Sequence, residues 1–397
     1  MKTFIQYFLL FLCNSRSVKF QKQRYYFLNK HLHIVSFDVP FPPDYGGVID
    51  VFYKLKALHQ EGIKIHLHCF EYGRGQKKEL EKYCENIFYY KRKVSKHLLF
   101  NSLPYIVASR SSEALVKNLL QDDAPILFEG LHCCFHLSDE RLKSRKKIVR
   151  MHNIEHNYYA NLGQIEKSFF RKKYFEAEAK KLEKFESVLH NTNAIAAISP
   201  ADTKKLSVRY KNVSNVMAFH PHDKIEIKEG KGDFALYHGS LAVGENNKAA
   251  LYLANEVFND VAIPLIVAGN GASSELKEAV SKRKNIQLKE NISTQAIYSL
   301  IQEAQINILP TFQATGIKLK LLSALYSGRH CMANSPMAEN TGLESLCSIT
   351  DSPHEMKKEI LQLMNIEFSG ENKAKREKIL GEHFSNKVNV RKLLELF

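Results

Sequence analysis

Two lysines stand at the start of a predicted helix and could bind an anion there. An apolar strand at 306–309 and a polar turn precede a helical pattern that begins at Ile317, with Thr315 as its N-cap. Lys318 and Lys320 oppose the positive end of the helix dipole, and the unpaired N–H groups there attract anions. The segment therefore predicts a phosphate or diphosphate site formed by Thr315, Gly316, Ile317 and Lys318. The simpler alternative is that both lysines point into water.

A second group of polar residues follows two predicted strands. His132 ends the apolar segment 125–132, and His152 and Asn153 end the segment 147–153, with Glu155 directly after it. Ligands of open α/β sheets bind beyond the carboxyl ends of the strands. A metal would need a further ligand at the right spacing, so we expect none. A packed, hydrogen-bonded core histidine is the alternative for His132.

Glycines follow three further predicted strands. Glycine at such turns lets the phosphate of a ligand approach the backbone, although loops also contain glycine for conformational reasons alone. No complete GxGxxG motif is present, which weighs against a dehydrogenase. The residues at these turns are Gly46 and Gly47, then Gly239 and Ser240, then Gly269 and Gly271.

The same alternation of strands and helices occurs twice along the 397 residues, which predicts two α/β domains with doubly wound parallel sheets. The predicted strands are 31–38, 63–70, 86–90, 125–132, 147–153 and 194–198, then 234–238, 264–268, 285–288, 306–309 and 330–333.

The predicted domains have the following boundaries. Residues 31–205 form the first, Rossmann-like domain, 206–232 the connection, and 233–370 the second domain. The helices of 371–397 pack back toward the first domain. We interpret residues 1–30 as an upstream extension, with a membrane-surface anchor and a signal peptide as the alternatives.

The net charge is +15, which favours anionic partners. No zinc-finger or RNP-like motif is present, so we do not expect nucleic acid. A long charged helix at 164–190 has either a solvated face or a basic face that contacts a membrane. The seven cysteines include no CxxC pair, and their odd number argues against a disulfide framework. A reducing cytoplasm fits this pattern.

With these elements placed, the chain resembles the retaining glycosyltransferases of family 4, which have the GT-B fold, and a Bacteroidetes-type bacterial subgroup among them. The match covers roughly residues 31–397. Its carriers are SFDVPFPPDYGGVIDVFYKLKALHQEG at 36–62, RMHNIEHNYY at 150–159, AISPAD at 197–202, YHGSLAVGENNKAA at 237–250, VAGNG at 267–271 and LPTFQATGIKLKLLSALYSG at 309–328.

The resemblance implies transfer of a sugar from a nucleotide-sugar, such as GDP-mannose or a UDP-sugar, to a glycan or lipid-linked acceptor. The configuration would be retained, with no metal or other cofactor, in the assembly of cell-surface polysaccharide. The family holds the donor in an interdomain cleft, mainly on the second domain. We expect a cytoplasmic location. This location also allows peripheral contact between the basic surface and the inner membrane face.

Individual residues match the family pattern. Gly46 and Gly47 correspond to a glycine loop near the donor phosphates, and Gly239 opens the phosphate loop of the second domain. His152 and Asn153 correspond to the strand end that faces the sugar. The remaining site candidates are Gly269 and Gly271 on the donor side and His132 and Glu155 on the acceptor side.

Three positions depart from the family pattern. Ser240 replaces an expected arginine, and Thr315 and Ser323 replace two glutamates, of which the second contacts the ribose. Lys318 could supply the missing positive charge, and Ser323 would take the ribose position. Because both carboxylates are lost, a non-catalytic nucleotide-sugar or glycan-binding protein and a sugar-nucleotide epimerase are the alternatives.

Overall fold

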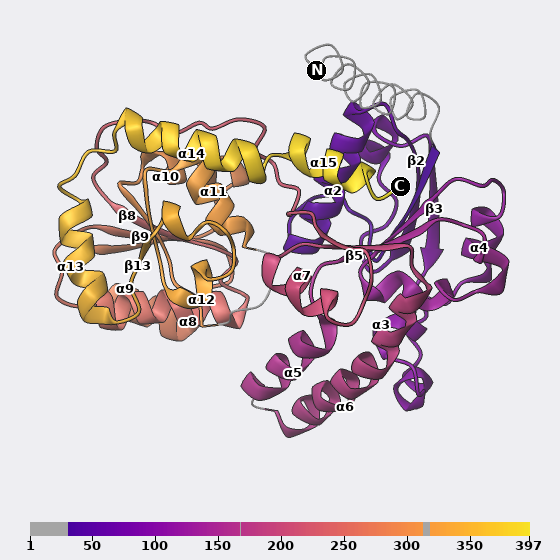
Figure 1. Ribbon diagram of the computed structural model, residues 1–397. Coiled ribbons are helices and arrows are strands. Elements are labelled where there is room, and N and C mark those ends of the chain that lie inside the picture. Colours follow the sequence, from indigo (N-terminus) through magenta and orange to yellow (C-terminus); the bar gives the residue numbers. More distant parts are fainter. Residues whose placement is uncertain (1–30, 167, 313–317) are drawn as a thin grey trace, which may run out of the picture. The chain divides into compact units, whose positions relative to one another are not determined.

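The computed structural model describes residues 31–166, 168–312 and 318–397 (Figure 1). The chain forms two compact units. Unit 1 contains the described residues up to Ala196, together with Tyr210–Val213 and Leu393–Phe397. Unit 2 contains Ala197–Arg209 and Ser214–Lys392. Each unit has its own parallel sheet.

The sheet of unit 1 has the strand order β3-β2-β1-β4-β5-β6-β7. Strands β4 and β6 are apolar except for Glu129, as expected for parallel strands that are covered on both faces, whereas β1 and β2 carry two histidines each. Their bounds are β1 His31–Ser36, β2 Lys64–Glu71, β3 Asn86–Lys91, β4 Ile126–Glu129, β5 Lys147–Met151, β6 Ala194–Ala197 and β7 Val213–Asn215.

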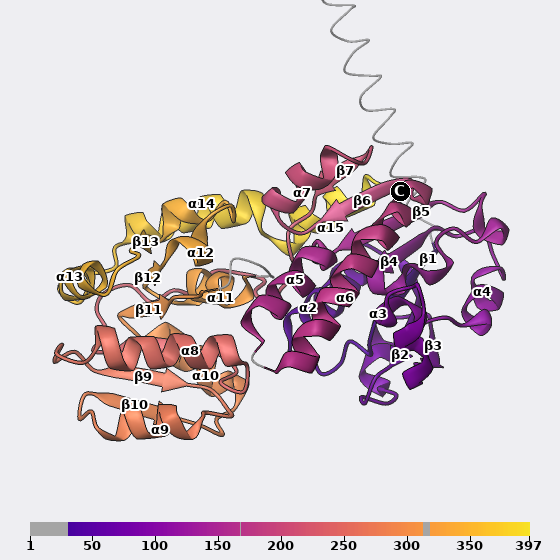
Figure 2. The ribbon, with the colours of Figure 1, turned by 90° about the horizontal axis from the view of Figure 1, so that it is seen from below.

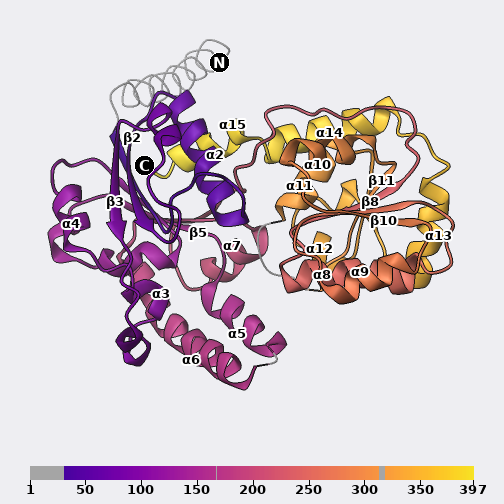
Figure 3. The ribbon, with the colours of Figure 1, turned by 180° about the vertical axis from the view of Figure 1, so that it is seen from behind.

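Helices lie on both sides of this sheet. Figures 1 and 3 show α2 and α4 on opposite sides of β2 and β3. The α-helices up to β7 are α2 Gly46–Gln60, α3 Tyr105–Ala108, α4 Glu113–Leu119, α5 Glu155–Ile165, α6 Phe169–Phe185 and α7 Pro200–Ser207. Short 3₁₀ segments include η2 Lys96–Phe100, η3 Leu131–His136 and η5 Glu186–Asn191.

The sheet of unit 2 has the order β10-β9-β8-β11-β12-β13. Figures 1 and 2 show α10, α11 and α14 over one face of this sheet and α8 and α9 over the other. The strands are β8 Ala235–His238, β9 Leu265–Ala268, β10 Ile286–Lys289, β11 Ile306–Leu309, β12 His330–Ala333 and β13 Ser348–Ile349. The α-helices are α8 Gly244–Tyr252, α9 Ser274–Ser281, α10 Thr294–Glu303, α11 Leu319–Ser327, α12 Ser335–Ala338, α13 Pro353–Leu363, α14 Gly370–His383 and α15 Asn386–Leu394.

The two sheets share one winding order, and this order places the sites. In each sheet the chain builds three strands outward in one direction and then returns to build in the other. The reversal lies between β1 and β4 in unit 1 and between β8 and β11 in unit 2. Ligands of doubly wound sheets bind beyond the carboxyl ends of the strands at this switch point. The doubly wound fold predicted from the sequence is confirmed.

The prediction of one long helix at 164–190 was wrong. The chain forms α5, breaks between Ile165 and Phe169, and then forms α6, because Glu166 and Ser168 have extended backbone angles. The break turns α6 back along α5 as a hairpin. Tyr159 on α5 and Phe175 on α6 pack against each other, with ring centroids 5.9 Å apart. A Cβ atom on Gly163 would make an ordinary contact there, 3.5 Å from Cβ of Phe175.

A chain of hydrogen bonds crosses the first strands of unit 1. His33 on β1 contacts Asp122 through Nε2 at 2.9 Å and His68 on β2 through Nδ1 at 2.8 Å. His68 Nδ1 lies 2.8 Å from the Tyr90 hydroxyl, which accepts a hydrogen bond from Asn118. Donation in a single direction, from Asn118 toward Asp122, satisfies every group when both imidazoles are neutral. Burial lowers the pKa of His33 and lowers that of His68 well below its usual range.

We expect this chain to make the protein sensitive to acid. Below about pH 6.5 the unfolded histidines bind protons while the buried ones resist, so the unfolded state is favoured as the pH falls. As the pH falls below this value, each buried histidine lowers the free energy of unfolding by up to about 1.4 kcal/mol per pH unit. Urea unfolding of His68→Gln between pH 7 and pH 5 should show a shallower loss of stability than the unsubstituted chain. His383→Gln, at an exposed position, is the control, and an equal slope in His68→Gln would contradict the assignment.

Candidate functional site

Five ionisable side chains form a buried cluster below the carboxyl edge of the unit 1 sheet. Lys54 Nζ lies 2.9 Å from Asp50 Oδ2, one turn away on α2, and 2.7 Å from Glu129 Oε1 at the end of β4. Arg150 on β5 donates to Asp50 Oδ1 at 2.9 Å. His152 Nε2 lies 2.9 Å from Glu129 Oε2. The cluster therefore ties α2 to the two strands beside the switch point.

The charges of this cluster balance one another. Burial alone would raise the pKa of Asp50, but Arg150, Lys54 and His152 hold it below its usual range. Burial would likewise raise the pKa of Glu129, and Lys54 and His152 lower it. Both carboxylates are therefore ionised, and the two cations neutralise them.

Asp50, Glu129 and His152 also lie close enough together to be considered as metal ligands. However, Lys54 Nζ already lies within hydrogen-bond distance of both carboxylates. A divalent cation would have to displace this ammonium group and would leave excess positive charge in a buried place. The donor set therefore fits a cluster that positions His152 better than a metal centre.

Glu129 sets the orientation of His152. Because Nε2 donates to the carboxylate, Nδ1 is left on the opposite side of the ring. Nδ1 of His152 and Nδ1 of His132 are buried and have no hydrogen-bond partner among the described residues. Buried polar atoms are rarely left in this state. A ligand that donates hydroxyl groups would satisfy both nitrogens.

His132 and His152 converge around Gly130 and Phe37. The ring of Phe37 lies 5.6 Å from that of His132 and 5.4 Å from that of His152, between centroids. Gly130 has φ 74°, and a Cβ atom there would lie 2.9 Å from His132 Nδ1. Glycine is therefore required both by the backbone and by the imidazole beside it.

His132 is a neutral imidazole in this site. Its burial lowers its pKa well below the usual range, and Arg110 and His152 add to the effect. Glu155, buried at the start of α5, places Oε1 3.9 Å from Nδ1 of His132. The predicted His132, His152 and Glu155 are thus brought together. Asn153 lies half-buried between β5 and α5, and its side chain has no hydrogen bond described to any of the three.

The glycine pair 46–47 was predicted as a loop but lies inside a helix. Both residues belong to the first turn of α2, which begins after Tyr45. A Cβ atom on Gly47 would lie 2.7 Å from Cζ of Phe37, whereas one on Gly46 would meet nothing within 4 Å. The contact with Phe37 therefore accounts for Gly47 and links α2 to the two histidines. A side chain at Gly46 would therefore meet no steric obstacle.

Unit 2 holds a group of cations at the carboxyl edge of its sheet. Lys320 Nζ donates to Asn246 Oδ1 at 2.9 Å and lies 5.3 Å from the ring centroid of Tyr237. Burial lowers the pKa of Lys318 to about 8, and Glu245 partly opposes this. Burial and Lys318 lower the pKa of Lys320 to about 8, again opposed by Glu245. Two ammonium groups thus share the field of one carboxylate, and an anion would stabilise their charged forms.

The predicted helix after β11 begins later than expected. α11 starts at Leu319, and Lys318 is its N-cap residue rather than a member of its first turn. Thr315, Gly316 and Ile317 lie outside the described residues. The described part of this candidate phosphate site is therefore Lys318 and Lys320, together with Glu245 and Asn246 from the start of α8.

His238 adds a second indication of a ligand here. It ends β8, is buried, and its Nε2 has no hydrogen-bond partner among the described residues. Burial lowers its pKa to about 3, with Lys320 contributing. Nearby, the Thr311 hydroxyl donates a hydrogen bond of 2.8 Å to Glu245 Oε1, which joins the start of α8 to the end of β11.

The glycines of unit 2 are explained by contacts within the protein. A Cβ atom on Gly269 would lie 1.8 Å from the carbonyl oxygen of Gly239. Gly271 has φ 82°, and a Cβ atom there would lie 2.7 Å from that of Ala242. These glycines let the loops after β8 and β9 pack together. Ser240 lies in the first of these loops, and its carbonyl accepts a hydrogen bond from Asn246 at 2.9 Å.

Ser323 lies in an aromatic environment on α11. Its hydroxyl is 3.0 Å from His222 Nε2 and is hydrogen-bonded to Tyr298. The His222 ring stacks on Tyr326 with centroids 5.2 Å apart. Burial lowers the pKa of His222 to about 3, so its ring is neutral. The Ser323 hydroxyl is thus hydrogen-bonded to two uncharged side chains, His222 and Tyr298, at a position where the family pattern has a carboxylate.

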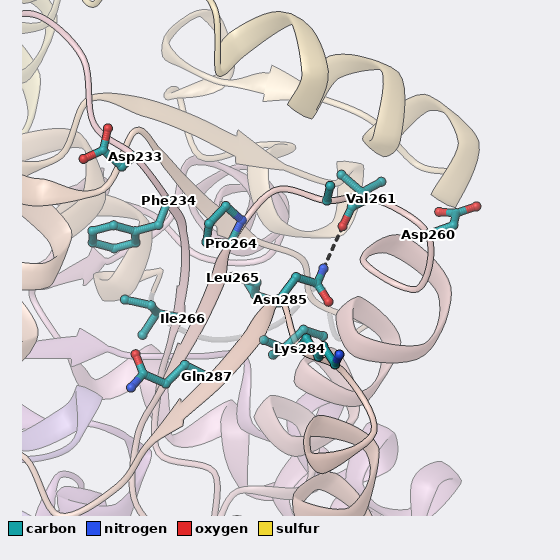
Figure 4. Close-up of a pocket in the computed structure, with 12 residues that line it drawn as sticks. Asp233, Phe234, Asp260, Val261, Pro264, Leu265, Ile266, Lys284, Asn285 and Gln287 are labelled. Atoms are coloured by element: carbon teal, nitrogen blue, oxygen red, sulfur yellow. Dashed lines mark hydrogen bonds between the residues drawn. The ribbon is translucent and has the colours of Figure 1, made fainter.

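A shallow hollow in unit 2 of about 1000 Å³ lies at the opposite edge of the sheet, at the amino ends of β8, β9 and β10 (Figure 4). Asn285 closes one side of it by donating to the Val261 carbonyl at 2.7 Å. None of the predicted site residues lines this hollow. We therefore do not assign it a role in the chemistry.

Comparison with known proteins identifies the fold. No family model matches the chain. A protein described as an uncharacterised 44.6 kDa protein in the cps region of Klebsiella pneumoniae is 29% identical over 330 residues, which cover 78% of this chain and 84% of that protein. The structure of TarM superposes with a TM-score of 0.67 at 12% identity, over 93% of this chain and 99% of TarM.

Two further solved structures agree with this result. A glycosyltransferase from Rickettsia africae has a TM-score of 0.61 at 14% identity, over 93% of this chain and 98% of its own. A second TarM structure, from S. aureus, in complex with fondaparinux, α-GlcNAc-glycerol and UDP, has a TM-score of 0.61 at 12% identity, over 93% and 99% of the two chains. The architecture is therefore that of the GT-B glycosyltransferases, as predicted.

Several residues of these sites were missed by the sequence analysis. Asp50 and Lys54 are an i, i+4 pair of opposite charges within an otherwise apolar helix face, and Arg150 interrupts an apolar strand. Buried charge in such positions usually has a partner, so these three could have been flagged. Nothing local to Glu245 or His238 indicated a role, because their neighbours come from distant parts of the chain.

We expect the buried cluster to stabilise unit 1 strongly. Glu129→Gln would leave Lys54 and Arg150 with one carboxylate, and removing one partner of a buried ion pair costs about 3–5 kcal/mol. Urea unfolding would measure this loss. Glu113→Gln removes one of the two carboxylate partners of the exposed Arg141 and should cost far less, because surface ion pairs contribute little. Similar values for the two variants would show that the cluster is not an energetic centre.

Proposed function

We propose that this chain is a glycosyltransferase that moves a sugar from a nucleotide-sugar to a glycan or lipid-linked acceptor. The motif resemblance to family 4 supports retention of configuration and independence of a metal. A relative from the cps region of Klebsiella pneumoniae supports a role in cell-surface polysaccharide assembly. The donor is a nucleoside diphosphate sugar, and its diphosphate binds to unit 2.

The observation that carries this proposal is the cation group at the switch point of unit 2. Lys318 and Lys320, each with a lowered pKa of about 8, face one carboxylate, Glu245. A diphosphate would add negative charge beside both ammonium groups, with backbone N–H groups at the start of α8 as further donors. Sugar transfer leaves a diphosphate with increasing negative charge, and preorganised cations stabilise that charge in the transition state. The UDP complex of TarM, a protein of the same fold, supports a nucleotide at such a fold.

Unit 1 supplies a site for hydroxyl groups in this proposal. Nδ1 of His152, oriented by Glu129, and Nδ1 of His132 accept hydrogen bonds from hydroxyls of the sugar or the acceptor. Asn153 and Glu155 follow His152 in the chain, and Gly46 lies in the first turn of α2, where an added Cβ atom would meet nothing within 4 Å. These groups hold the reacting hydroxyl and the sugar in place, which is a large part of catalysis by proximity.

A non-catalytic binding protein is the second candidate. The observation that favours it is Ser323, whose hydroxyl is held by His222 and Tyr298 where the family has a glutamate. A scaffold that has lost ribose and sugar carboxylates could bind a nucleotide-sugar without turning it over. An epimerase, the third candidate, predicts conversion of the donor when no acceptor is present.

A thermal-shift screen of the full chain tests the proposal. The ligands are UDP, GDP, ADP and their common sugar conjugates, because a ligand that binds only the native state raises the melting temperature by mass action. A shift with one nucleotide family supports the donor site. Incubation of that donor with and without a glycan acceptor then separates transfer, mere binding and epimerisation. No shift with any nucleotide would overturn the proposed donor site.

Lys318→Ala should weaken binding of the nucleoside diphosphate by about 1–3 kcal/mol, the scale of a charge-assisted hydrogen bond. Isothermal titration calorimetry would measure the affinity. Lys282→Ala is the matched control, because this exposed lysine pairs with Glu278 on the surface. Equal affinities of Lys318→Ala and the control would remove Lys318 from the site.

Binding of the diphosphate should also be coupled to proton uptake. Lys318 and Lys320 have pKa values of about 8 without an anion, and the bound diphosphate raises them. Affinity should therefore fall as the pH rises through 8, while the phosphate, with a second pKa of about 6, stays ionised. Calorimetry at pH 8 in buffers of different ionisation enthalpy would detect the uptake, and identical enthalpies in all buffers would contradict it.

Ser323→Glu tests the ribose position. If the hydroxyl occupies a vacated ribose contact, a carboxylate there should strengthen binding of the donor nucleotide, since ribose hydroxyls donate well to carboxylates. Competition calorimetry with a deoxyribose analogue would show whether the gain requires the ribose hydroxyl. Unchanged affinity in Ser323→Glu would place the ribose elsewhere.

A further inference from the structure

The N-terminal end of α6 exposes two phenylalanines. Phe169 and Phe170 have 66% and 84% of their surface accessible, whereas most large apolar residues of the described chain are buried. Their rings lie 5.9 Å apart in an edge-to-face arrangement and pack on each other rather than on the core. They follow directly on the break that turns α6 back along α5, so they stand at the end of the helical hairpin (Figures 1 and 2).

The exposed face of α6 behind these rings is basic. The helix carries six lysines and arginines against three glutamates. The exposed cations include Arg171 and Lys173, which have 71% and 60% of their side-chain surface accessible. Further exposed lysines along the helix are Lys172, Lys180 and Lys184.

A second exposed apolar group flanks the same helix. Phe100 and Val94 have 90% and 68% of their surface accessible, and Leu99 has 40%. The carbonyl of Leu99 accepts a hydrogen bond of 2.8 Å from Lys181 on α6, which holds the η2 segment against the helix. Lys96 and His97 add basic character to this segment. Both apolar groups therefore border one basic helix.

We propose that this surface of unit 1, formed by the start of α6, its basic face and the η2 segment, docks on an anionic lipid bilayer. The phenylalanines insert between the headgroups, and the lysines and arginines bind the lipid phosphates. Apolar side chains beside cations are the combination that retains a helix at a membrane surface, and each charge near the surface adds to the attraction. A solvated face would account for the lysines but not for the exposed phenylalanines.

The attachment is interfacial. Among the residues that the structure describes, no helix is long and apolar enough to cross a membrane. Peripheral docking needs only the tips of Phe169, Phe170 and Phe100 and the adjacent charges. It requires neither the transfer reaction nor the diphosphate site of unit 2, so failure of either proposal leaves the other intact.

The absence of tryptophan from the chain permits a direct test. Phe170→Trp in the full chain introduces a single fluorophore at the end of the hairpin and keeps an aromatic ring there. Addition of phosphatidylglycerol vesicles should shift its emission to shorter wavelength, and brominated lipids should quench it. Ile366→Trp, half-exposed in unit 2, is the matched control and should show neither change.

Charge reversal then tests the basic face. In the Phe170→Trp chain, K172E with K180E should raise the phosphatidylglycerol concentration needed for half-maximal shift by about tenfold or more, since each basic residue near an anionic bilayer adds to the attraction. The control pair K378E with K387E changes the net charge equally on exposed positions of unit 2 and should have little effect.

Each outcome decides the proposal. A shift that requires anionic lipid and is weakened only by the α6 pair supports it. Vesicle binding by sedimentation without a change in the emission of the Phe170→Trp chain would assign the contact to another segment, such as residues 1–30, and overturn it. A shift caused equally by neutral phosphatidylcholine vesicles, or no binding at all, would also overturn it.

Discussion

Charge buried at the carboxyl edge of each parallel sheet is the constraint on which the rest of this protein depends. In unit 1 the constraint is met internally, because Asp50 and Glu129 are matched by Lys54 and Arg150. Leaving any one of them unpaired in this interior would be costly. The cluster also holds α2 against β4 and β5, and through Glu129 it fixes the ring of His152. The packing of α2 in unit 1 and the orientation of His152 thus depend on the same group of buried charges.

The carboxyl edge of the unit 2 sheet has a different arrangement of charged side chains. Lys318 and Lys320 both lie in the field of the Glu245 carboxylate, and burial lowers the pKa of both. Such an arrangement is less stable alone than with an anion present, which is the usual condition of a binding site rather than of a structural ion pair. Unit 1 therefore has a cluster of matched ion pairs at this edge, whereas unit 2 has two lysines of lowered pKa beside the carboxylate of Glu245.

Packing of glycine against ring and backbone connects these clusters to the fold. The lack of a side chain at Gly130 leaves room for His132, and at Gly47 it leaves room for Phe37. At Gly269 it leaves room for the carbonyl of Gly239. Gly130 and Gly269 permit this close approach directly after a strand and Gly47 in the first turn of α2, near the edge where the winding order places the ligand. The α5–α6 hairpin differs, since its exposed phenylalanines are not packed in a hydrophobic core.

The sequence by itself determined the fold class and the positions of eleven of the thirteen described strands, because most strands of a buried parallel sheet are largely apolar segments of a recognisable length. It did not indicate the short strands β7 and β13. It also marked Lys318, Lys320, His132 and His152, since polar groups after such runs fall at the carboxyl edge. Only the tertiary structure decided which of them have partners. Asp50, Glu129 and Arg150 meet from a helix and two strands, and Glu245 reaches Thr311 from a distance of 66 residues. The break before Phe169 was decided there as well, because helical propensity is local whereas the packing of Tyr159 on α5 against Phe175 on α6 is not.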